Sequence, residues 1–180
     1  MIQRLVGSEM CIRDSTIVDQ YAACEPLGIS AEAPVVVVKE LQKKNFIGGA
    51  AIVATHIKSL GAECTFLSVT GCDSMSNYIN KELINNGINS NLIKDQTRPT
   101  TLKKRYIVDN QKLFRVSKIE EHKLNKKVED QIINKLRLFA PKINGIVVSD
   151  FVYGVITKKI LDEIQKLSKK YSLMLFGDIQ

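Results

Sequence analysis

The sequence predicts an α/β protein with a parallel central sheet, helices on the faces of that sheet, and a separate small β-hairpin. Short β-branched runs alternate with segments whose apolar residues recur at helical spacing, which is typical of repeated βαβ units. The stretch from Thr100 to Ser117 has a period of two instead, the pattern of paired strands. With 180 residues, 44% of them hydrophobic, the chain is long enough for one sizeable core.

The first half of the chain is expected to alternate between strands and helices. Strands are recognised here by shortness and β-branched composition, and helix ends by glycine or a capping side chain. In chain order the elements are the strand Pro34–Lys39, a helix opened by Gly48-Gly49 and ended by Gly61, the strand Cys64–Val69, and a helix capped by Asp73 or Ser74 and ended by Gly87.

The hairpin comes next in the chain. Leu102, Lys104 and Tyr106 alternate with Lys103 and Arg105, and Asp109-Asn110 supplies a turn. Both faces of this hairpin carry positive charge, so we expect a sheet that is partly open to solvent or to an anion.

The alternation of strands and helices then resumes to the end of the chain. A helix carries Val128–Phe139, the strand Ile146–Val148 comes after it, a second helix carries Ile156–Tyr171, and the last strand is Leu173–Phe176. The chain stops at Gln180, directly after a core strand that has no covering helix. We therefore expect a fragment that is incomplete at its C-terminus.

The first fifteen residues, MIQRLVGSEMCIRDS, do not join smoothly to the segment that begins at Thr16, and they resemble translated adapter or vector sequence. We expect residues 1–15 to be a read-through artefact or disordered, and leave them out of the predicted fold.

Composition excludes several classes of function. The net charge is +7, but the lysines are scattered among Glu and Asp without a zinc-finger, RRM or basic-zipper pattern, so we expect no nucleic-acid partner. No apolar run approaches the roughly 20 residues that cross a bilayer, and no secretory signal opens the chain, so we expect a cytoplasmic protein without a membrane partner. The four cysteines form no C-x-x-C pair and have no His at ligand spacing, so no metal cluster is indicated.

Three aspartates are expected at the C-terminal ends of strands, where open parallel sheets bind ligands. Asp150 and Asp178 come after predicted strands, and Asp19 comes after Thr16–Val18. Each is equally consistent with a carboxylate that caps the next turn or helix.

Two further features leave alternatives open. Gly48-Gly49 opens a helix whose N–H groups can face an anion, although a tight strand-to-helix turn also needs glycine. The hairpin cations and amides suit sugar hydroxyls and a phosphate, and suit equally an exposed edge that resists aggregation. These hairpin residues are Lys103, Arg105, Asn110, Gln111 and Arg115.

Eight short blocks carry a resemblance to one enzyme family. In chain order they are Asp19-Gln20-Tyr21, Ile29–Val35 (ISAEAPV), Gly48–Ala51 (GGAA), Leu60-Gly61-Ala62, Val69–Asp73 (VTGCD), Arg98–Lys103 (RPTTLK), Asn110–Val116 (NQKLFRV) and Val148–Val155 (VSDFVYGV). Together they resemble the first half of the ribokinase (PfkB) family of carbohydrate kinases. Within that family the resemblance is closest to the kinase domain of heptose-7-phosphate kinases and bifunctional ADP-heptose synthases.

The resemblance implies a ribokinase-like fold in which residues 16–180 are the N-terminal part of a PfkB-type kinase domain. It implies ATP-dependent phosphorylation of a sugar or sugar phosphate, with a heptose 7-phosphate favoured and with ATP and Mg²⁺ as cofactors. Segments at about 34–47 and 100–117 would form a small β-lid that closes over the substrate and mediates a homodimer.

The resemblance also assigns roles to single residues. Asp19 would bind sugar hydroxyls, Gly48 and Gly49 would let the backbone approach the sugar, Lys103, Asn110 and Gln111 would approach the substrate or its phosphate, and Asp150 would face the phosphate and Mg²⁺.

Departures from the family pattern limit this assignment. Ile52 stands where the family has a sugar-binding Asn, and Tyr153 stands where it has a Lys. The G-A-G-D motif with the catalytic Asp does not occur before Gln180, so we expect the fragment itself to be inactive and most of the nucleotide site to lie outside it. A PfkB kinase for another sugar or nucleoside, and a non-catalytic sugar-phosphate-binding domain, are the alternatives.

Overall fold

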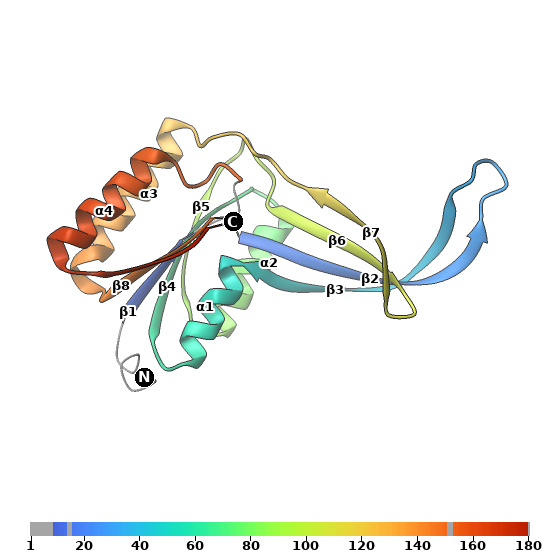
Figure 1. Cartoon of the computed structure of the whole chain (residues 1–180), viewed down its shortest axis with the longest axis horizontal. Coiled ribbons are helices and arrows are strands. Elements are labelled where there is room, and N and C mark those ends of the chain that lie inside the picture. Colours follow the sequence, from blue (N-terminus) through green and yellow to red (C-terminus); the bar gives the residue numbers. More distant parts are fainter. Residues whose placement is uncertain (1–8, 14–15, 151–152, 180) are drawn as a thin grey trace.

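The computed structural model describes residues 9–13, 16–150 and 153–179, and these residues form two sheets (Figure 1). The first sheet has the strand order β5-β4-β1-β8-β9, and all its described pairs are parallel. Its strands are β1 (Glu9–Arg13), β4 (Glu63–Thr70), β5 (Asn89–Lys94), β8 (Gly145–Asp150) and β9 (Met174–Ile179). This central sheet confirms the predicted parallel architecture.

Helices cover both faces of the central sheet, and each face has its own core. The helices are α1 (Ala50–Ser59), α2 (Ser74–Asn85), α3 (Lys126–Phe139), which a short 3₁₀ turn (Ala140–Lys142) extends, and α4 (Lys158–Tyr171). On β4, Phe66 packs with α1 and α2, whereas Leu67 packs with α3 and α4. The alternation along one strand therefore feeds both cores, as expected for a sheet that is buried on both faces.

Capping side chains begin three of the helices. Asp73 accepts a hydrogen bond from the Ser76 amide at the start of α2, which confirms one of the two predicted caps. Asn125 and Thr157 cap α3 and α4 in the same way.

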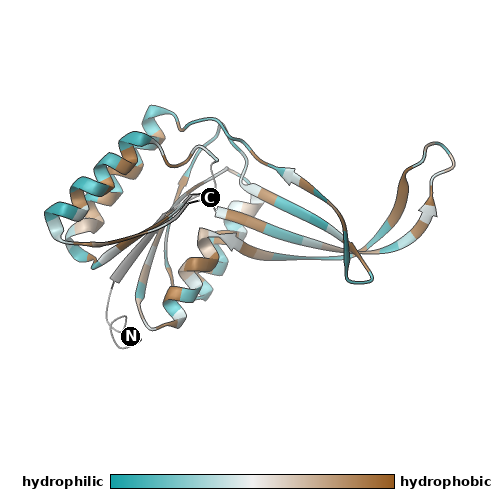
Figure 2. Cartoon of the chain, viewed as in Figure 1, coloured by the Kyte–Doolittle hydropathy of each residue, from teal (hydrophilic) through white to brown (hydrophobic). Residues whose placement is uncertain are grey.

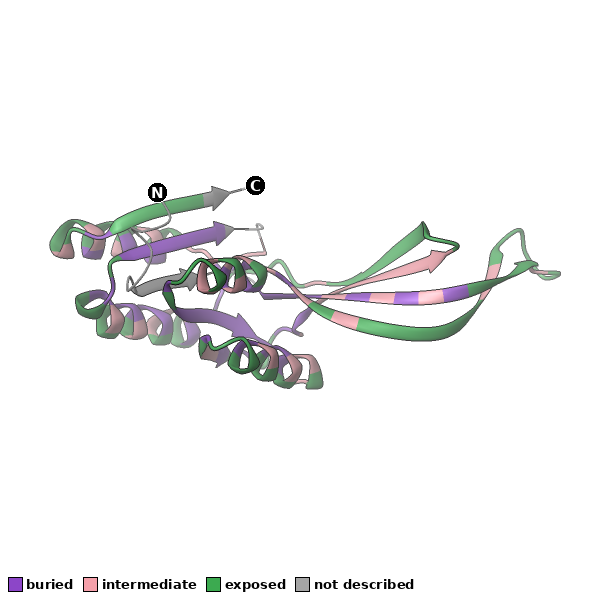
Figure 3. Ribbon diagram, turned by 90° about the horizontal axis from the view of Figure 1, so that it is seen from below, coloured by how far each residue is buried: buried purple, intermediate pink, exposed green. Residues whose placement is uncertain are grey.

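The second sheet is mixed and projects away from the first (Figures 1 and 3). Its order is β3-β2-β6-β7, where β2 pairs antiparallel with β3 and parallel with β6. The strands are β2 (Thr16–Ile29), β3 (Val36–Gly49), β6 (Thr101–Val108) and β7 (Gln111–Lys118). The segments expected in a lid, about 34–47 and 100–117, thus fall in this sheet together with β2.

The hairpin turn is where the sequence places it. Asp109 and Asn110 have φ values of 46° and 66°, the left-handed conformation that a two-residue hairpin turn needs.

Beyond the four-stranded part, β2 and β3 continue as a two-stranded arm. The pairing of β2 with β6 ends at Ala23 and Ile107, but the pairing of β2 with β3 continues to Ile29 and Val36. The arm is largely exposed, and apolar residues occur on both of its strands (Figures 2 and 3).

Three expectations differ from the structure. Residues 9–13, left out of the predicted fold, form β1 in the middle of the central sheet. Asp19 does not end a core strand, because β2 continues through it into the second sheet. The strand predicted at Pro34–Lys39 begins later and runs on to Gly49, since its later residues pair with β2. The origin of residues 1–15 as read-through stays a prediction.

Candidate functional site

One face of the second sheet gathers most of the candidate residues. Parallel pairing sets Asp19 opposite Lys103 and Tyr21 opposite Arg105. Antiparallel pairing on the other side sets Phe46 opposite Asp19. Because side chains two residues apart on a strand share a face, these residues form one surface, here called the open face.

Asp19 is the carboxylate at the root of the open face. Its side chain is 24% exposed and forms an ion pair with the Arg105 guanidinium. Gly48 lies directly behind it: a Cβ atom at this position would overlap the Asp19 carboxylate and lie 3.2 Å from its Cγ. Glycine is therefore required at position 48 for Asp19 to keep this position.

The start of α1 adjoins this carboxylate. Gly49 precedes the helix with a φ of 57°, which favours glycine, and no side chain caps the helix. The first amides of α1 thus lack a side-chain acceptor and lie next to Gly48, where an anion or a polar ligand is favoured by the helix dipole.

Lys103 connects the open face with the central sheet. Its ammonium group lies 5.4 Å from the ring centre of Tyr153, in the loop after β8. Asp150 is the last residue of β8, at the C-terminal end of a parallel strand as predicted, and its side chain lies outside the described residues. The open face therefore meets the central sheet close to the edge where α/β proteins bind ligands.

A pocket of about 570 Å³ extends along the open face. It is lined by Asp19, Tyr21, Ala23, Gln42, Lys44, Phe46, Ile107 and Asn110. Asp19 and Asn110 thus share one pocket although 91 positions separate them in the numbering. Gln111, the first residue of β7, is exposed and is not among the lining residues.

The aromatic and lysine side chains of this pocket were not predicted from the sequence. Tyr21 and Phe46 contact each other edge to face, with ring centres 5.7 Å apart. Lys44 comes from the same strand as Phe46. For Tyr21, the sequence does contain a signal: its period-two spacing from Asp19 places both side chains on one face of a longer strand.

The model of the pfkB family of carbohydrate kinases matches residues 8–175. The chain belongs to this family. The match begins one residue before β1, which supports the place of Glu9–Arg13 in the fold.

Curated relatives place this PfkB chain near the heptose kinases. It is 33% identical over 163 residues to the bifunctional protein HldE of Helicobacter acinonychis, and this match covers 90% of the chain and 35% of HldE. It is 31% identical over 156 residues to the D-beta-D-heptose 7-phosphate kinase of Bordetella bronchiseptica, covering 87% of the chain and 49% of that kinase. The chain thus spans about a third to a half of the length of these relatives.

Solved structures confirm the ribokinase-like fold. Phosphofructokinase-2 from Escherichia coli in complex with fructose-6-phosphate superposes with a TM-score of 0.70 at 12% identity, covering 97% of the chain and 55% of that enzyme. Ribokinase from Giardia lamblia gives a TM-score of 0.64 at 15% identity, with coverages of 94% and 54%.

A buried arginine joins three loops at the root of the second sheet of this PfkB chain. The Arg98 Nε donates to the Asp95 carboxylate at 3.0 Å, and the two side chains are 5% and 1% exposed. Its two terminal nitrogens donate to the carbonyl oxygens of Tyr153, at 3.1 Å, and His122, at 2.6 Å. The loops after β5, β7 and β8 are therefore held together beside the open face.

Asp73 provides a second link at this root. Besides capping α2, its carboxylate accepts a 2.8 Å hydrogen bond from the Thr100 amide, at the entry to β6. Burial opposes ionisation of this group, but the hydrogen bonds from Thr100 and Ser76 outweigh it and lower the pKa of Asp73. The ionised Asp73 carboxylate thus fixes the residue that precedes β6.

The remaining expectations concern the membrane and metals. None of the helices described in the structure is long and apolar enough to cross a membrane. Among the described side chains, no group of three or more His, Cys, Asp or Glu residues is placed to hold a metal ion.

Proposed function

We propose that this chain supplies the sugar-binding half of an ATP-dependent sugar-phosphate kinase, with a heptose 7-phosphate as the favoured acceptor. The observation that carries the proposal is the pocket on the open face, where the Asp19 carboxylate lies among cationic and aromatic side chains. The named heptose 7-phosphate kinase among the relatives supports the choice of acceptor.

The chemistry of the pocket suits a phosphorylated sugar. A carboxylate accepts hydrogen bonds from several hydroxyl groups, and Asp19 is the carboxylate that lines the pocket. Lys44 and the amides of Gln42 and Asn110 add donors for ring oxygens or a phosphate. The Tyr21 ring supplies an apolar surface for the sugar carbons.

ATP would supply the phosphoryl group, and Mg²⁺ would neutralise its charge. Mg²⁺ in kinases is held by one or two carboxylates together with substrate phosphates, so this half of the site need not form a complete metal cage. The role proposed for the described residues is to bind and orient the acceptor and to exclude water from it. Since positioning of both substrates supplies most of the rate in phosphoryl transfer, we propose that the 180-residue chain alone has no appreciable kinase activity.

An assay of ADP release tests this proposal. The product of the complete gene and the 180-residue chain are each incubated with ATP, Mg²⁺ and a panel that contains a heptose 7-phosphate, fructose 6-phosphate, ribose and a nucleoside. We expect sugar-dependent ADP release from the complete product, highest with the heptose 7-phosphate, and none from the short chain. Turnover by the short chain would contradict the proposed division of the site, and a preference for another acceptor would identify a different PfkB kinase.

We propose further that the second sheet acts as a lid and joins two copies of the protein. Support comes from the arm, because a two-stranded ribbon is marginally stable alone and this one exposes apolar side chains such as Ile29 (76% exposed) and Val36 (63%). Light scattering of the wild-type protein and of the Ile29→Lys variant tests the idea. A dimer that the substitution dissociates is expected, and a wild-type monomer at all concentrations would contradict it.

A further inference from the structure

The open face carries far more positive than negative charge. On its four-stranded part, the register places Asp19 with five cationic residues. These are Lys44, Lys103, Arg105, Lys112 and Arg115. Arg105 and Arg115 lie directly opposite each other on neighbouring antiparallel strands. Like charges in this arrangement repel and destabilise a sheet, so stability of the fold does not account for the pair.

Arg105 uses only part of its hydrogen-bonding capacity. One terminal nitrogen, Nη1, serves both the Asp19 carboxylate and, at 3.5 Å, the Lys103 carbonyl oxygen. Nε and Nη2, with three N–H groups between them, donate to no described residue. The guanidinium lies 5.3 Å from the Tyr21 ring centre, which orients its plane. The Nε and Nη2 donors of Arg105 are thus held in position and available to an anion.

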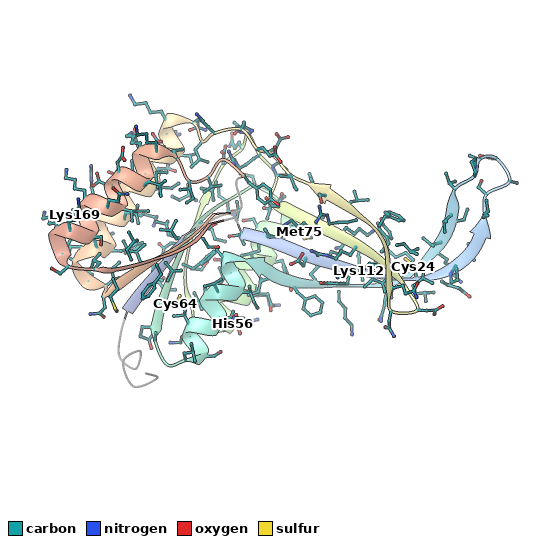
Figure 4. The ribbon with its side chains drawn as sticks, in the orientation of Figure 1. Cys24, His56, Cys64, Met75, Lys112 and Lys169 are labelled. Carbon is teal, nitrogen blue, oxygen red and sulfur yellow. The ribbon has the colours of Figure 1, made fainter. Side chains whose placement is uncertain are left out.

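Arg105 also lies between two pockets. Its partner Asp19 lines the pocket of about 570 Å³ on the open face. Arg105 itself lines a second pocket of about 440 Å³, together with Lys112, Leu113, Phe114 and Arg115. Figure 4 shows Lys112 at the far end of the β6–β7 hairpin. The second pocket has three cationic side chains and no carboxylate among its lining residues.

We propose that Arg105 is the specificity-determining residue for the phosphate of the acceptor, and that its ion pair with Asp19 is exchanged when the substrate binds. Sugar hydroxyls donate to the Asp19 carboxylate and replace the guanidinium there. The released guanidinium turns to the phosphate, assisted by Arg115. This inference rests on the proposed function, since it names the acceptor as a sugar that carries a phosphate.

The exchange makes the two halves of the substrate depend on each other. A sugar without a phosphate has to displace Arg105 from Asp19 and gives the guanidinium no new anionic partner. A phosphorylated sugar supplies both a donor for Asp19 and an acceptor for Arg105, with the bidentate geometry that guanidinium groups form with phosphate. The unphosphorylated sugar is therefore selected against, because its binding leaves the Arg105 guanidinium unpaired.

Titration calorimetry on the 180-residue protein tests this exchange. The probes are a heptose 7-phosphate, the same heptose without its phosphate, and inorganic phosphate. The variants are Arg105→Gln, Arg105→Lys and the matched control Lys104→Gln, whose side chain lies on the opposite face of β6 and pairs with Glu40. Thermal melts show which variants are folded.

For the wild-type protein we expect the phosphorylated heptose to bind at least about tenfold more tightly than the free heptose. In Arg105→Gln the affinity for the phosphorylated heptose should fall by about the same factor. Affinity for the free heptose should stay equal or rise, because Asp19 is no longer paired. Lys104→Gln should preserve the wild-type ratio. If Arg105→Gln does not fold, Arg105→Lys provides the test. Its ratio of affinities for the phosphorylated and the free heptose should then lie between the wild-type ratio and one.

The outcomes separate this inference from the proposed function. Equal weakening of both sugars by Arg105→Gln, or an unchanged ratio, would overturn the exchange and leave the sugar site standing. Binding of inorganic phosphate that depends on Arg105, without binding of either sugar, would overturn the proposed acceptor and keep Arg105 as an anion ligand. Binding of none of the three probes would overturn both.

Discussion

Loss of the buried Arg98 is expected to destabilise the protein more than loss of any surface cation. The Arg98→Met substitution keeps an unbranched side chain and removes the guanidinium group with its charge. It leaves the Asp95 carboxylate, 1% exposed, with Thr97 as its remaining hydrogen-bond donor, and leaves the carbonyl oxygens of His122 and Tyr153 without this donor. Breaking one partner of a buried ion pair destabilises a protein by about 3–5 kcal/mol. In a chain of this size, 1 kcal/mol corresponds to roughly 2–4 °C, so the melting temperature should fall by roughly 6–20 °C.

Circular dichroism melts of four proteins give the measurement. Wild type and Arg98→Met are compared with the double variant Asp95→Asn/Arg98→Met and with Arg137→Met. Arg137, whose side chain is 54% exposed, forms an ion pair with Glu163 at 2.7 Å, so its replacement should lower the melting temperature far less than Arg98→Met does. The double variant should recover part of the loss, because no buried charge is left unpaired. The reasoning fails if Arg98→Met melts together with Arg137→Met.

Three further predictions concern pH, the glycine behind the carboxylate, and the thiols. Because the pKa of Asp73 is lowered in the folded state, the ionised carboxylate stabilises the fold above about pH 4, and this stabilisation is lost as the pH falls through the lowered pKa. Urea midpoints measured from pH 7 to pH 2 should show the loss. The Asp73→Asn variant should show a smaller decrease of the midpoint over the same pH range. Gly48→Ala should displace the Asp19 carboxylate and weaken sugar binding at least about tenfold, measured by the same calorimetry, whereas unchanged affinity would show that Asp19 tolerates the added methyl group. Burial raises the pKa of the Cys64 thiol to about 12, so iodoacetamide at pH 8 should label exposed Cys72 and spare Cys64, as peptide mass spectrometry can establish.

Helices and hairpins whose patterns lie within one short stretch of sequence could be predicted. The β6–β7 hairpin follows from its alternation and from the Asp109-Asn110 turn, and helices α3 and α4 follow from apolar residues at helical spacing. Only the start of strand β2, Thr16–Val18, is predicted from the sequence, although the strand continues through Pro26 and Gly28 to Ile29. The structure accommodates them at a register shift between Pro26 and Gly28, where an irregular strand tolerates a missing donor.

The site was less predictable than the fold, since it depends on register between distant strands. The Asp19–Arg105 pair joins residues 86 positions apart, and only the parallel pairing of β2 with β6 brings them to one face. Strand β1 is absent from the prediction because residues 1–15 resemble read-through sequence and are left out of the predicted fold. The burial of Arg98 is not predicted from the sequence, because arginine is rarely buried unless it is paired. Only the structure shows its ion pair with Asp95.

The attachment of the second sheet explains why stability and substrate binding should be linked in this protein. The sheet meets the central one where Arg98 binds two loop carbonyls, where Asp73 fixes the Thr100 amide, and where Lys103 approaches Tyr153. Gly71 packs against the same turn so closely that a Cβ atom there would lie 2.6 Å from the Thr100 nitrogen. The root is therefore held by hydrogen bonds and close packing, while the arm beyond it is exposed. In the proposed function, the substrate contacts Asp19 on the second sheet and reacts at the edge of the central sheet, so loosening this root should lower affinity even when every contact residue is intact.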